Sequence, residues 1–191
     1  MNPVLLKAKK VVGTEGYILG EINDLHFDFD AWQATAFYVI LSDEAAAELD
    51  MKKQFLRKIM VCLPTELIKA VGDVIELKEP IRNLKDIAEK EMQVDNVKVE
   101  GKKVFSPNGE VLGEVDGVDV DLDNWRVNGL QVALNDKAAM ELGFSRPFLS
   151  KVIVIIPGSA IGEIENFVTL DKSVQNLRSL VECIKNCQLQ K

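Results

Sequence analysis

The sequence is poor in the side chains that most often carry chemistry at neutral pH. Among 191 residues it has one histidine, His26, three cysteines and 6% aromatic residues. One histidine leaves little room for acid–base catalysis or metal ligation, and three cysteines are too few for a disulfide framework. The sequence contains no Ser-His-Asp, Cys-His or paired acid–base set. We therefore expect a non-enzymatic protein with no cofactor and no metal site.

Basic charge, long apolar runs and a secretory signal are also lacking. Lysine and arginine number 23 against 30 acidic residues, a net charge of -7, which argues against direct binding of nucleic acid. The longest apolar runs, such as Val152 to Ile156, are far shorter than the roughly 20 residues of a membrane-spanning helix. We expect a cytoplasmic protein without a membrane span. Its apolar fraction of 47% is enough to build a hydrophobic core.

One segment of the chain occurs twice. A shift of 93 positions lays Val11 to Leu77 on Val104 to Leu170 without a gap, and about 20 of roughly 67 positions are identical. A tandem duplication explains this match. We predict a first domain at residues 1–91, a linker at 92–102 and a second domain at 103–191, each domain ending in a helix.

The periodicity within each copy is that of short β-strands. Apolar residues alternate from Ile18 to Ile22, and the phase then slips near Asn23 and again near Asp116, which indicates a bulge or bend. Ser42 and Asn135 are good N-caps for a short helix after the next strand. Short, bent, antiparallel strands favour a barrel, which closes on itself and leaves no exposed sheet edge. The predicted fold class is mainly β, with two small antiparallel β-barrels in tandem, each followed by an α-helix.

Two segments must lie against something outside the barrel interior. The strand Val152 to Ile156 is apolar on both faces, so one face fills the barrel and the other needs a cover: a helix, the sister barrel or another chain. The C-terminal apolar residues are spaced three or four apart, which predicts a helix with a seam about two heptads long. This helix either docks on its own barrel, which we favour, or forms a coiled coil between chains. The segment Pro80 to Glu91 has similar helical spacing.

Each copy also carries the same short motif of a Gly-Glu strand, an apolar strand with interleaved aspartates, and a tryptophan. The motif residues are Gly20-Glu21-Ile22, Phe27-Asp28-Phe29-Asp30 and Trp32, and again Gly113-Glu114-Val115, Val120-Asp121-Leu122-Asp123 and Trp125. In this pattern the chain resembles the PRC-barrel family, named after a β-barrel in the H subunit of the photosynthetic reaction centre. The resemblance covers about 150 of the 191 residues.

The resemblance implies a role in protein–protein interaction rather than a reaction. PRC-barrel proteins look like adaptors in the reaction centre, in ribosome maturation, and in archaeal cell division with SepF and FtsZ. The chain lacks the additional N-terminal barrel of the ribosome-maturation factor and the membrane helix of the H subunit, so it looks most like the archaeal division group. The resemblance therefore implies a scaffold that SepF-like or other division proteins recruit to the division site. The alternative is an adaptor that binds a basic ribosomal protein.

The candidate partner-binding residues lie on the outward side of the two-faced strands, on the seam of the C-terminal helix and in an acidic stripe. They are Met60, Cys62, Ile153 and Ile155 on the strands, Val174, Leu177, Val181 and Ile184 on the helix, and Asp28, Asp30, Asp121 and Asp123 in the stripe. The stripe either faces a basic partner or only keeps the protein soluble, which we favour. A metal-dependent sensor enzyme built on the stripe is a third hypothesis. We expect the copies to form an intramolecular pseudo-dimer or the chain to form a homo-oligomer.

The remaining polar and aromatic candidates are expected to be structural. His26 shares a strand face with carboxylates, which we interpret as a solvated surface rather than a metal or proton-relay site. Cys183 and Cys187 lie one helical turn apart and are expected to be free thiols rather than part of a zinc site. Trp32 and Trp125 are expected to pack at the mouths of the barrels.

Overall fold

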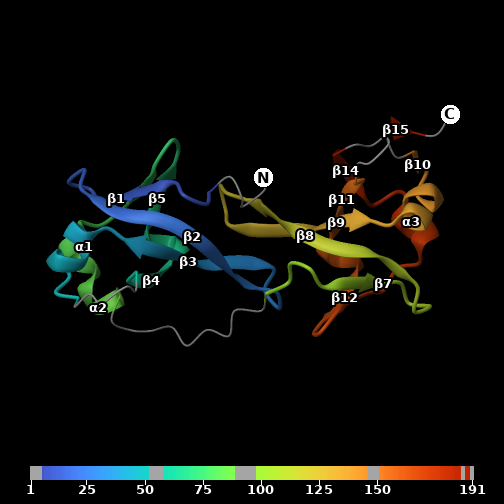
Figure 1. Ribbon diagram of the computed structural model, residues 1–191, viewed down its shortest axis with the longest axis horizontal. Helices are drawn as coiled ribbons and strands as arrows, with labels where there is room; N and C mark the ends of the chain where they lie inside the picture. The colour runs from blue at the N-terminus through green and yellow to red at the C-terminus, as the bar shows by residue number, and fades with distance from the viewer. Residues whose placement is uncertain (1–5, 52–57, 89–97, 146–150, 186–187, 190–191) are drawn as a thin grey trace. The chain divides into compact units, whose positions relative to one another are not determined.

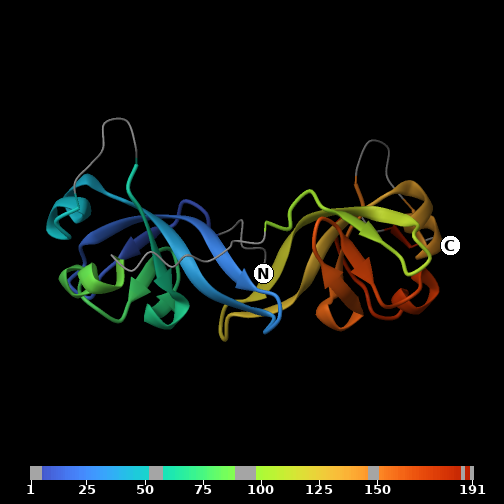
Figure 2. The ribbon, with the colours of Figure 1, turned by 90° about the horizontal axis from the view of Figure 1, so that it is seen from below.

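The computed structural model describes residues 6–51, 58–88, 98–145, 151–185 and 188–189. The chain forms two compact units, unit 1 mainly Pro3–Val97 and unit 2 mainly Lys98–Asp121 with Val127–Lys191. The structure is mainly β, and the strands of each unit form a curled, mixed sheet (Figures 1 and 2). The predicted fold class is confirmed at this level.

Unit 1 contains six of the described strands, with short helical segments between and after them. Its elements are β1 (Lys10–Val12), β2 (Ile18–Asp28), β3 (Gln33–Leu41), α1 (Asp43–Glu48), β4 (Met60–Pro64), the 3-10 helix η2 (Thr65–Leu67), β5 (Ile68–Val71), β6 (Ile75–Leu77), the 3-10 helix η3 (Ile81–Leu84) and α2 (Lys85–Ala88). Residues 89–91 of the helix predicted from Pro80 lie outside the described residues.

Unit 2 repeats this series with three additional described strands, one after its first helix and two after its last. Its elements are β7 (Lys103–Phe105), β8 (Val111–Asp121), β9 (Arg126–Leu134), α3 (Asp136–Glu141), β10 (Phe144–Ser145), β11 (Ile153–Pro157), the 3-10 helix η4 (Gly158–Ala160), β12 (Ile161–Ile164), β13 (Val168–Leu170), α4 (Val174–Leu177), β14 (Glu182–Lys185) and β15 (Gln188–Leu189). Strands β10 and β15 form a separate antiparallel pair.

The strand order in each unit shows why the sheet is mixed. Unit 1 runs β4-β3-β2-β1-β6-β5, and unit 2 runs β14-β11-β9-β8-β7-β13-β12. Most neighbours are antiparallel, but β1 pairs with β6 in parallel, and β7 pairs with β13 in parallel. The prediction of a purely antiparallel sheet is therefore wrong. Local periodicity shows that a segment is a strand, but the first and last strands of a unit meet through long-range pairing that periodicity does not report.

The backbone conformation of unit 1 recurs in unit 2. From β1 with β7 through β6 with β13, the paired strands have bounds 93 residues apart, as do α1 with α3 and η2 with η4. The residues with positive φ also pair at this offset. They are Ala8 with Gly101, Gly16 with Gly109, Trp32 with Trp125, and Asp50 with Gly143. Left-handed conformations are costly for tryptophan, so their presence at the same place in both units means that the surrounding hairpins impose them.

Several local predictions are confirmed. Ser42 and Asn135 cap α1 and α3, and their side-chain oxygens accept hydrogen bonds from the backbone N–H groups of Ala45 (3.0 Å) and Ala138 (2.8 Å). The phase slip near Asn23 is a register shift in the pairing of β2 with β3. Trp32 is half-buried with its ring edge-on to Phe29, centroids 5.8 Å apart.

The prediction of a long C-terminal helix is wrong. Helix α4 ends at Leu177, and residues 182–185 form β14, which pairs antiparallel with β11. Four apolar residues at helical spacing satisfy the helical pattern, but the edge of β11 offers a ladder of backbone hydrogen bonds, and that long-range pairing determines the structure. Cys183 is disulfide-bonded rather than a free thiol. Cys187 lies outside the described residues.

Candidate protein-binding surface

The strand residues proposed from the sequence have different environments in the two units. In unit 1, Met60 on β4 is 52% exposed and Cys62 is half-buried. Strand β4 pairs with β3, and no other described strand pairs with its second edge. In unit 2 the equivalent strand β11 pairs with both β9 and β14. Ile153 is buried there and Ile155 is half-buried, so the expectation that β11 is covered on its second face is met at Ile153 and in part at Ile155.

Cys62 has the properties of a structural thiol. Burial raises its pKa, against the opposing effect of a hydrogen bond with Tyr38 on the neighbouring strand. A thiol with a raised pKa is almost entirely protonated at neutral pH, and it is the thiolate that reacts. Cys62 is therefore a packing residue beside an exposed methionine rather than a nucleophile.

The acidic stripe is divided between structural and exposed positions. Asp28 is half-buried, and its Oδ1 accepts hydrogen bonds from the backbone N–H groups of Asp30 and Ala31, both at 2.9 Å. Asp30 and Asp123 are exposed, and Asp121 is half-buried. Within the described ranges, no group of three or more histidine, cysteine, aspartate or glutamate residues is placed to hold a metal ion. Asp28 thus holds the turn between β2 and β3 in shape.

The predicted helical seam does not form one surface. Val174 and Leu177 on α4 are buried, Leu177 completely. Val181 follows the helix and is half-buried, whereas Ile184 lies on β14 and is 43% exposed. Two of the four residues therefore belong to α4, one to β14 and one to the segment between them.

His26 is buried, with 5% of its surface exposed, so the prediction of a solvated strand face is wrong at this position. Three consecutive residues of β2, Leu25, His26 and Phe27, are all buried, and the pairing register shifts between His26 and Phe27. The register shift interrupts the simple alternation of buried and exposed residues on which the prediction relied.

A concavity of unit 1 lies at the end of the sheet that carries α1. It is a groove of about 990 Å³ between the β1–β2 turn, the start of α1 and the start of η3, and we call it the α1 groove. Tyr17 and Ile18 are 71% and 44% exposed at its rim. Ala45 and Ile81 are buried in its floor. Large exposed apolar side chains beside a groove are typical of binding sites.

Glu15 connects the β1–β2 turn to η3 through a hydrogen bond. Its carboxylate accepts a hydrogen bond from the backbone N–H of Ile81 at 2.9 Å, and the Thr14 hydroxyl donates to it at 3.3 Å. Burial acts to raise the pKa of Glu15, but hydrogen bonds from its own N–H, Ile81 and Thr14, together with the charge of Arg82, lower it overall. Glu15 is therefore an ionised structural brace of the groove wall.

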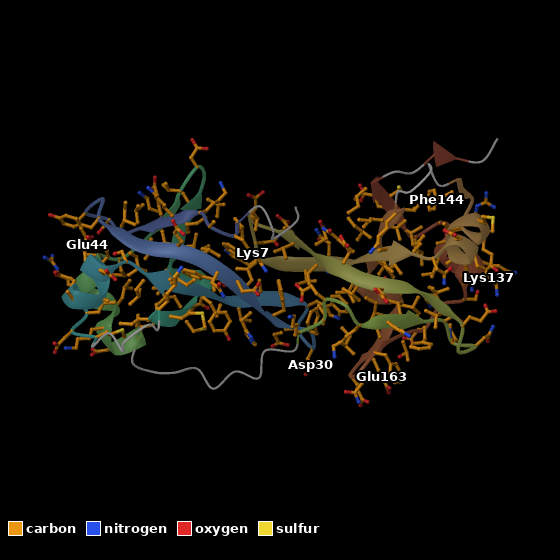
Figure 3. All side chains as sticks on the ribbon, in the orientation of Figure 1. Lys7, Asp30, Glu44, Lys137, Phe144 and Glu163 are labelled. Atoms are coloured by element: carbon orange, nitrogen blue, oxygen red, sulfur yellow. The ribbon has the colours of Figure 1, made fainter. Side chains whose placement is uncertain are left out.

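Two further glutamates stand on the α1 side of the groove. Glu44 and Glu48 are exposed and lie one helical turn apart (Figure 3 labels Glu44). Among the side chains that the structure describes, none forms a hydrogen bond or ion pair with either carboxylate. Like charges at this spacing repel each other and destabilise a helix slightly.

The same place in unit 2 is occupied by an ion pair. Lys137 on α3 is the equivalent of Glu44, and Glu110 is the equivalent of Tyr17. The Nζ of Lys137 lies 2.7 Å from Oε1 of Glu110 (Figure 3 labels Lys137). It also lies 3.8 Å from Glu141, the equivalent of Glu48. The hydrogen bond and charge of Glu110 raise the pKa of Lys137. A lysine of the chain itself therefore pairs with both carboxylates at this end of unit 2.

Reasoning from sequence missed the α1 groove. The signal was present at the aligned pairs Tyr17 with Glu110 and Glu44 with Lys137, where an aromatic residue and a charge reversal interrupt otherwise similar segments. Sequence alone did not indicate that these two differences meet in space.

No protein-family model matches the chain, and no curated protein matches it. Within the described residues, no helix has the length and hydropathy needed to cross a membrane.

Proposed function

We propose that the protein is a non-enzymatic adaptor that binds another protein through the α1 groove. The observation that carries this proposal is the groove itself, with the exposed Tyr17 and Ile18 at its rim and the buried Ala45 and Ile81 in its floor. Tyrosine at the edge of an apolar depression is typical of protein interfaces, where it supplies a large contact area together with a hydroxyl group. The exposed Met60 on β4 extends the apolar surface of unit 1.

We propose in addition that the two units are PRC-type barrels that arose by tandem duplication. The matching element bounds and the four matched pairs of positive-φ residues support a common ancestor. The resemblance in the Gly-Glu, aspartate and tryptophan motifs supports the family. On that resemblance, the partner would belong to the cell-division machinery, with SepF-like proteins first among the candidates, and recruitment to the division site would follow.

Photo-crosslinking in the native cell tests the adaptor proposal. Tyr17 is replaced by benzoylphenylalanine, and in a control chain the replaced residue is Phe167, an exposed aromatic residue of unit 2. We expect irradiation to join a discrete protein to the chain labelled at position 17 and not to the control. An absence of crosslinked product at position 17, with both chains expressed and folded, would contradict the proposal.

Identification of the crosslinked protein separates the candidate partners. A SepF-like or FtsZ-like product supports a role in division, whereas a small-subunit ribosomal protein supports the ribosome-maturation alternative.

A further inference from the structure

We infer that the α1 groove takes a protein segment in which a lysine or arginine side chain is flanked by apolar residues, and that unit 2 has no such site because Lys137 already fills the place of that cation. This inference rests on the proposed function in assuming that the ligand is a protein. It adds the chemistry of the ligand and assigns binding to one of the two units.

The first step of the argument is the charge balance of the groove. Its lining includes three glutamates and one arginine, Arg82. Glu15 is already engaged by the Ile81 N–H and lies near Arg82. Glu44 and Glu48 have no described partner and repel each other along α1. A ligand cation would relieve this repulsion, and complementary charge also increases the rate of encounter and selects against acidic partners.

The second step is an internal comparison within the chain. In unit 2 a lysine ammonium group lies between two carboxylates, those of Glu110 and Glu141, at 2.7 Å and 3.8 Å. In unit 1 one of these carboxylates is retained as Glu48, while the lysine is replaced by Glu44 and the other carboxylate by Tyr17. Unit 2 therefore shows that an ammonium group fits beside the glutamate that the two helices share, which is Glu48 on α1 and Glu141 on α3.

The third step concerns the apolar part of the ligand. Tyr17 and Ile18 are the rim residues, and both are large and exposed. A free ammonium ion would leave them in water, whereas an apolar side chain next to the cation would cover them and add hydrophobic stabilisation. The aromatic face of Tyr17 can also attract a cation directly. A segment with both kinds of side chain uses the whole groove.

Fluorescence anisotropy with defined peptides tests the inference on the full chain. The probe is a fluorescein-labelled octapeptide that alternates leucine and lysine. The two comparison peptides replace every lysine by glutamate or every leucine by serine. We expect saturable binding of the leucine–lysine peptide and at least about tenfold weaker binding of each comparison peptide. Equal binding of all three, or no binding of the leucine–lysine peptide, would overturn the inference.

Variants locate the site. The double substitution Tyr17→Glu with Glu44→Lys reproduces in unit 1 the ion pair of unit 2 and is expected to weaken peptide binding at least about tenfold. Glu163→Gln, an exposed change in unit 2 that alters the net charge by the same amount (Figure 3 labels Glu163), is expected to leave binding unchanged. An equal loss in both variants would mean that net charge alone attracts the peptide. Circular dichroism confirms that each variant is folded.

The reciprocal exchange adds a gain of binding. Glu110→Tyr with Lys137→Glu gives unit 2 the residues that stand at positions 17 and 44 of the α1 groove, and we expect the number of peptides bound per chain in titration calorimetry to rise from one to two. A stoichiometry of two in the unmodified chain would contradict the assignment to unit 1. If position 17 crosslinks to a protein in the cell but the peptides bind without regard to charge, the adaptor function stands and this inference fails. If the peptides bind according to charge but no protein is crosslinked, the ligand chemistry of the groove stands and the adaptor function fails.

Discussion

Units 1 and 2 share a backbone and differ at one end. The strand bounds and the left-handed residues coincide, yet α1 carries Glu44 and Glu48 beside an open groove, whereas α3 carries Lys137 within reach of two carboxylates. The comparison teaches that the fold tolerates either arrangement, since the caps at Ser42 and Asn135 and the buried alanines behind them are retained. The two ends therefore differ in their surface residues rather than in their backbone.

The largest effects on stability are expected from substitutions at the two equivalent glycines where the neighbouring strand leaves no room for a side chain. A Cβ on Gly20 would lie 2.0 Å from the carbonyl oxygen of Ile40, and one on Gly113 would lie 2.1 Å from that of Ala133. We expect Gly20→Ala and Gly113→Ala each to destabilise its own unit by on the order of 4 kcal/mol. Urea unfolding measures the loss, and hydrogen exchange with mass spectrometry assigns it to a unit.

Gly72→Ala is the matched control for this pair, because the nearest atom to its added Cβ is 3.8 Å away. It should change the free energy of unfolding by less than about 0.5 kcal/mol. If Gly20→Ala and Gly113→Ala were as mild as the control, the close packing of β2 on β3 and the equivalent packing in unit 2 would be wrong.

The next effect concerns the short helices that follow the equivalent strands β6 and β13. Leu84 in η3 and Leu177 in α4 are both fully buried and equivalent in position. We expect Leu84→Ala and Leu177→Ala to cost about 3 kcal/mol each, measured by urea unfolding. Leu180→Ala, at a side chain that is 43% exposed, is the control. A small effect of Leu177→Ala would indicate that this leucine serves a partner, as the sequence had indicated, rather than the core of unit 2.

The successes and failures of the sequence-based predictions follow the range of the interactions. The N-caps, the phase slip near Asn23 and the strand at Val152 to Ile156 depend on neighbours along the chain, and the structure confirms them. The parallel pairing of β1 with β6 and the strand β14 depend on residues distant in sequence, and periodicity could not report them. The α1 groove is assembled from three separate segments, so its residues carried no common local signal.

A smaller effect is expected at the caps. Ser42→Ala and Asn135→Ala each remove a side-chain acceptor from the first turn of a helix, and each should cost about 1 kcal/mol in thermal or urea unfolding. Restoring an acceptor with Ser42→Asp should recover most of the loss. Because the caps are equivalent, a loss in only one unit would show that α1 and α3 are not held in the same way.

The smallest effect is a pH dependence that only unit 1 should show. The pKa of Glu15 is lowered in the folded state, so its contribution to stability is present above its ordinary pKa of 4.5 and is lost as the pH falls through the lowered value. We expect Glu15→Gln to lower the melting temperature slightly at pH 7 and the difference to vanish in strong acid. Unit 2 has the uncharged Asn108 at this position.

Glu66→Gln serves as the control for this measurement, because Glu66 is exposed and its side chain has no hydrogen bond within the described part of the chain. Its melting curve should follow that of the unmodified protein at every pH. A pH dependence in Glu15→Gln that matches the unmodified protein would remove Glu15 as the brace between the β1–β2 turn and η3.

The most direct test of the difference between the units is a titration of the isotopically labelled full chain with the leucine–lysine octapeptide, followed by amide resonances in NMR. We expect the amide signals of Tyr17, Ile18, Ala45 and Ile81 to move in a saturable manner, while those of Glu110, Val111, Ala138 and Val174 stay in place. Equal movement of both sets would contradict the claim that one unit binds and the other is closed by its own lysine.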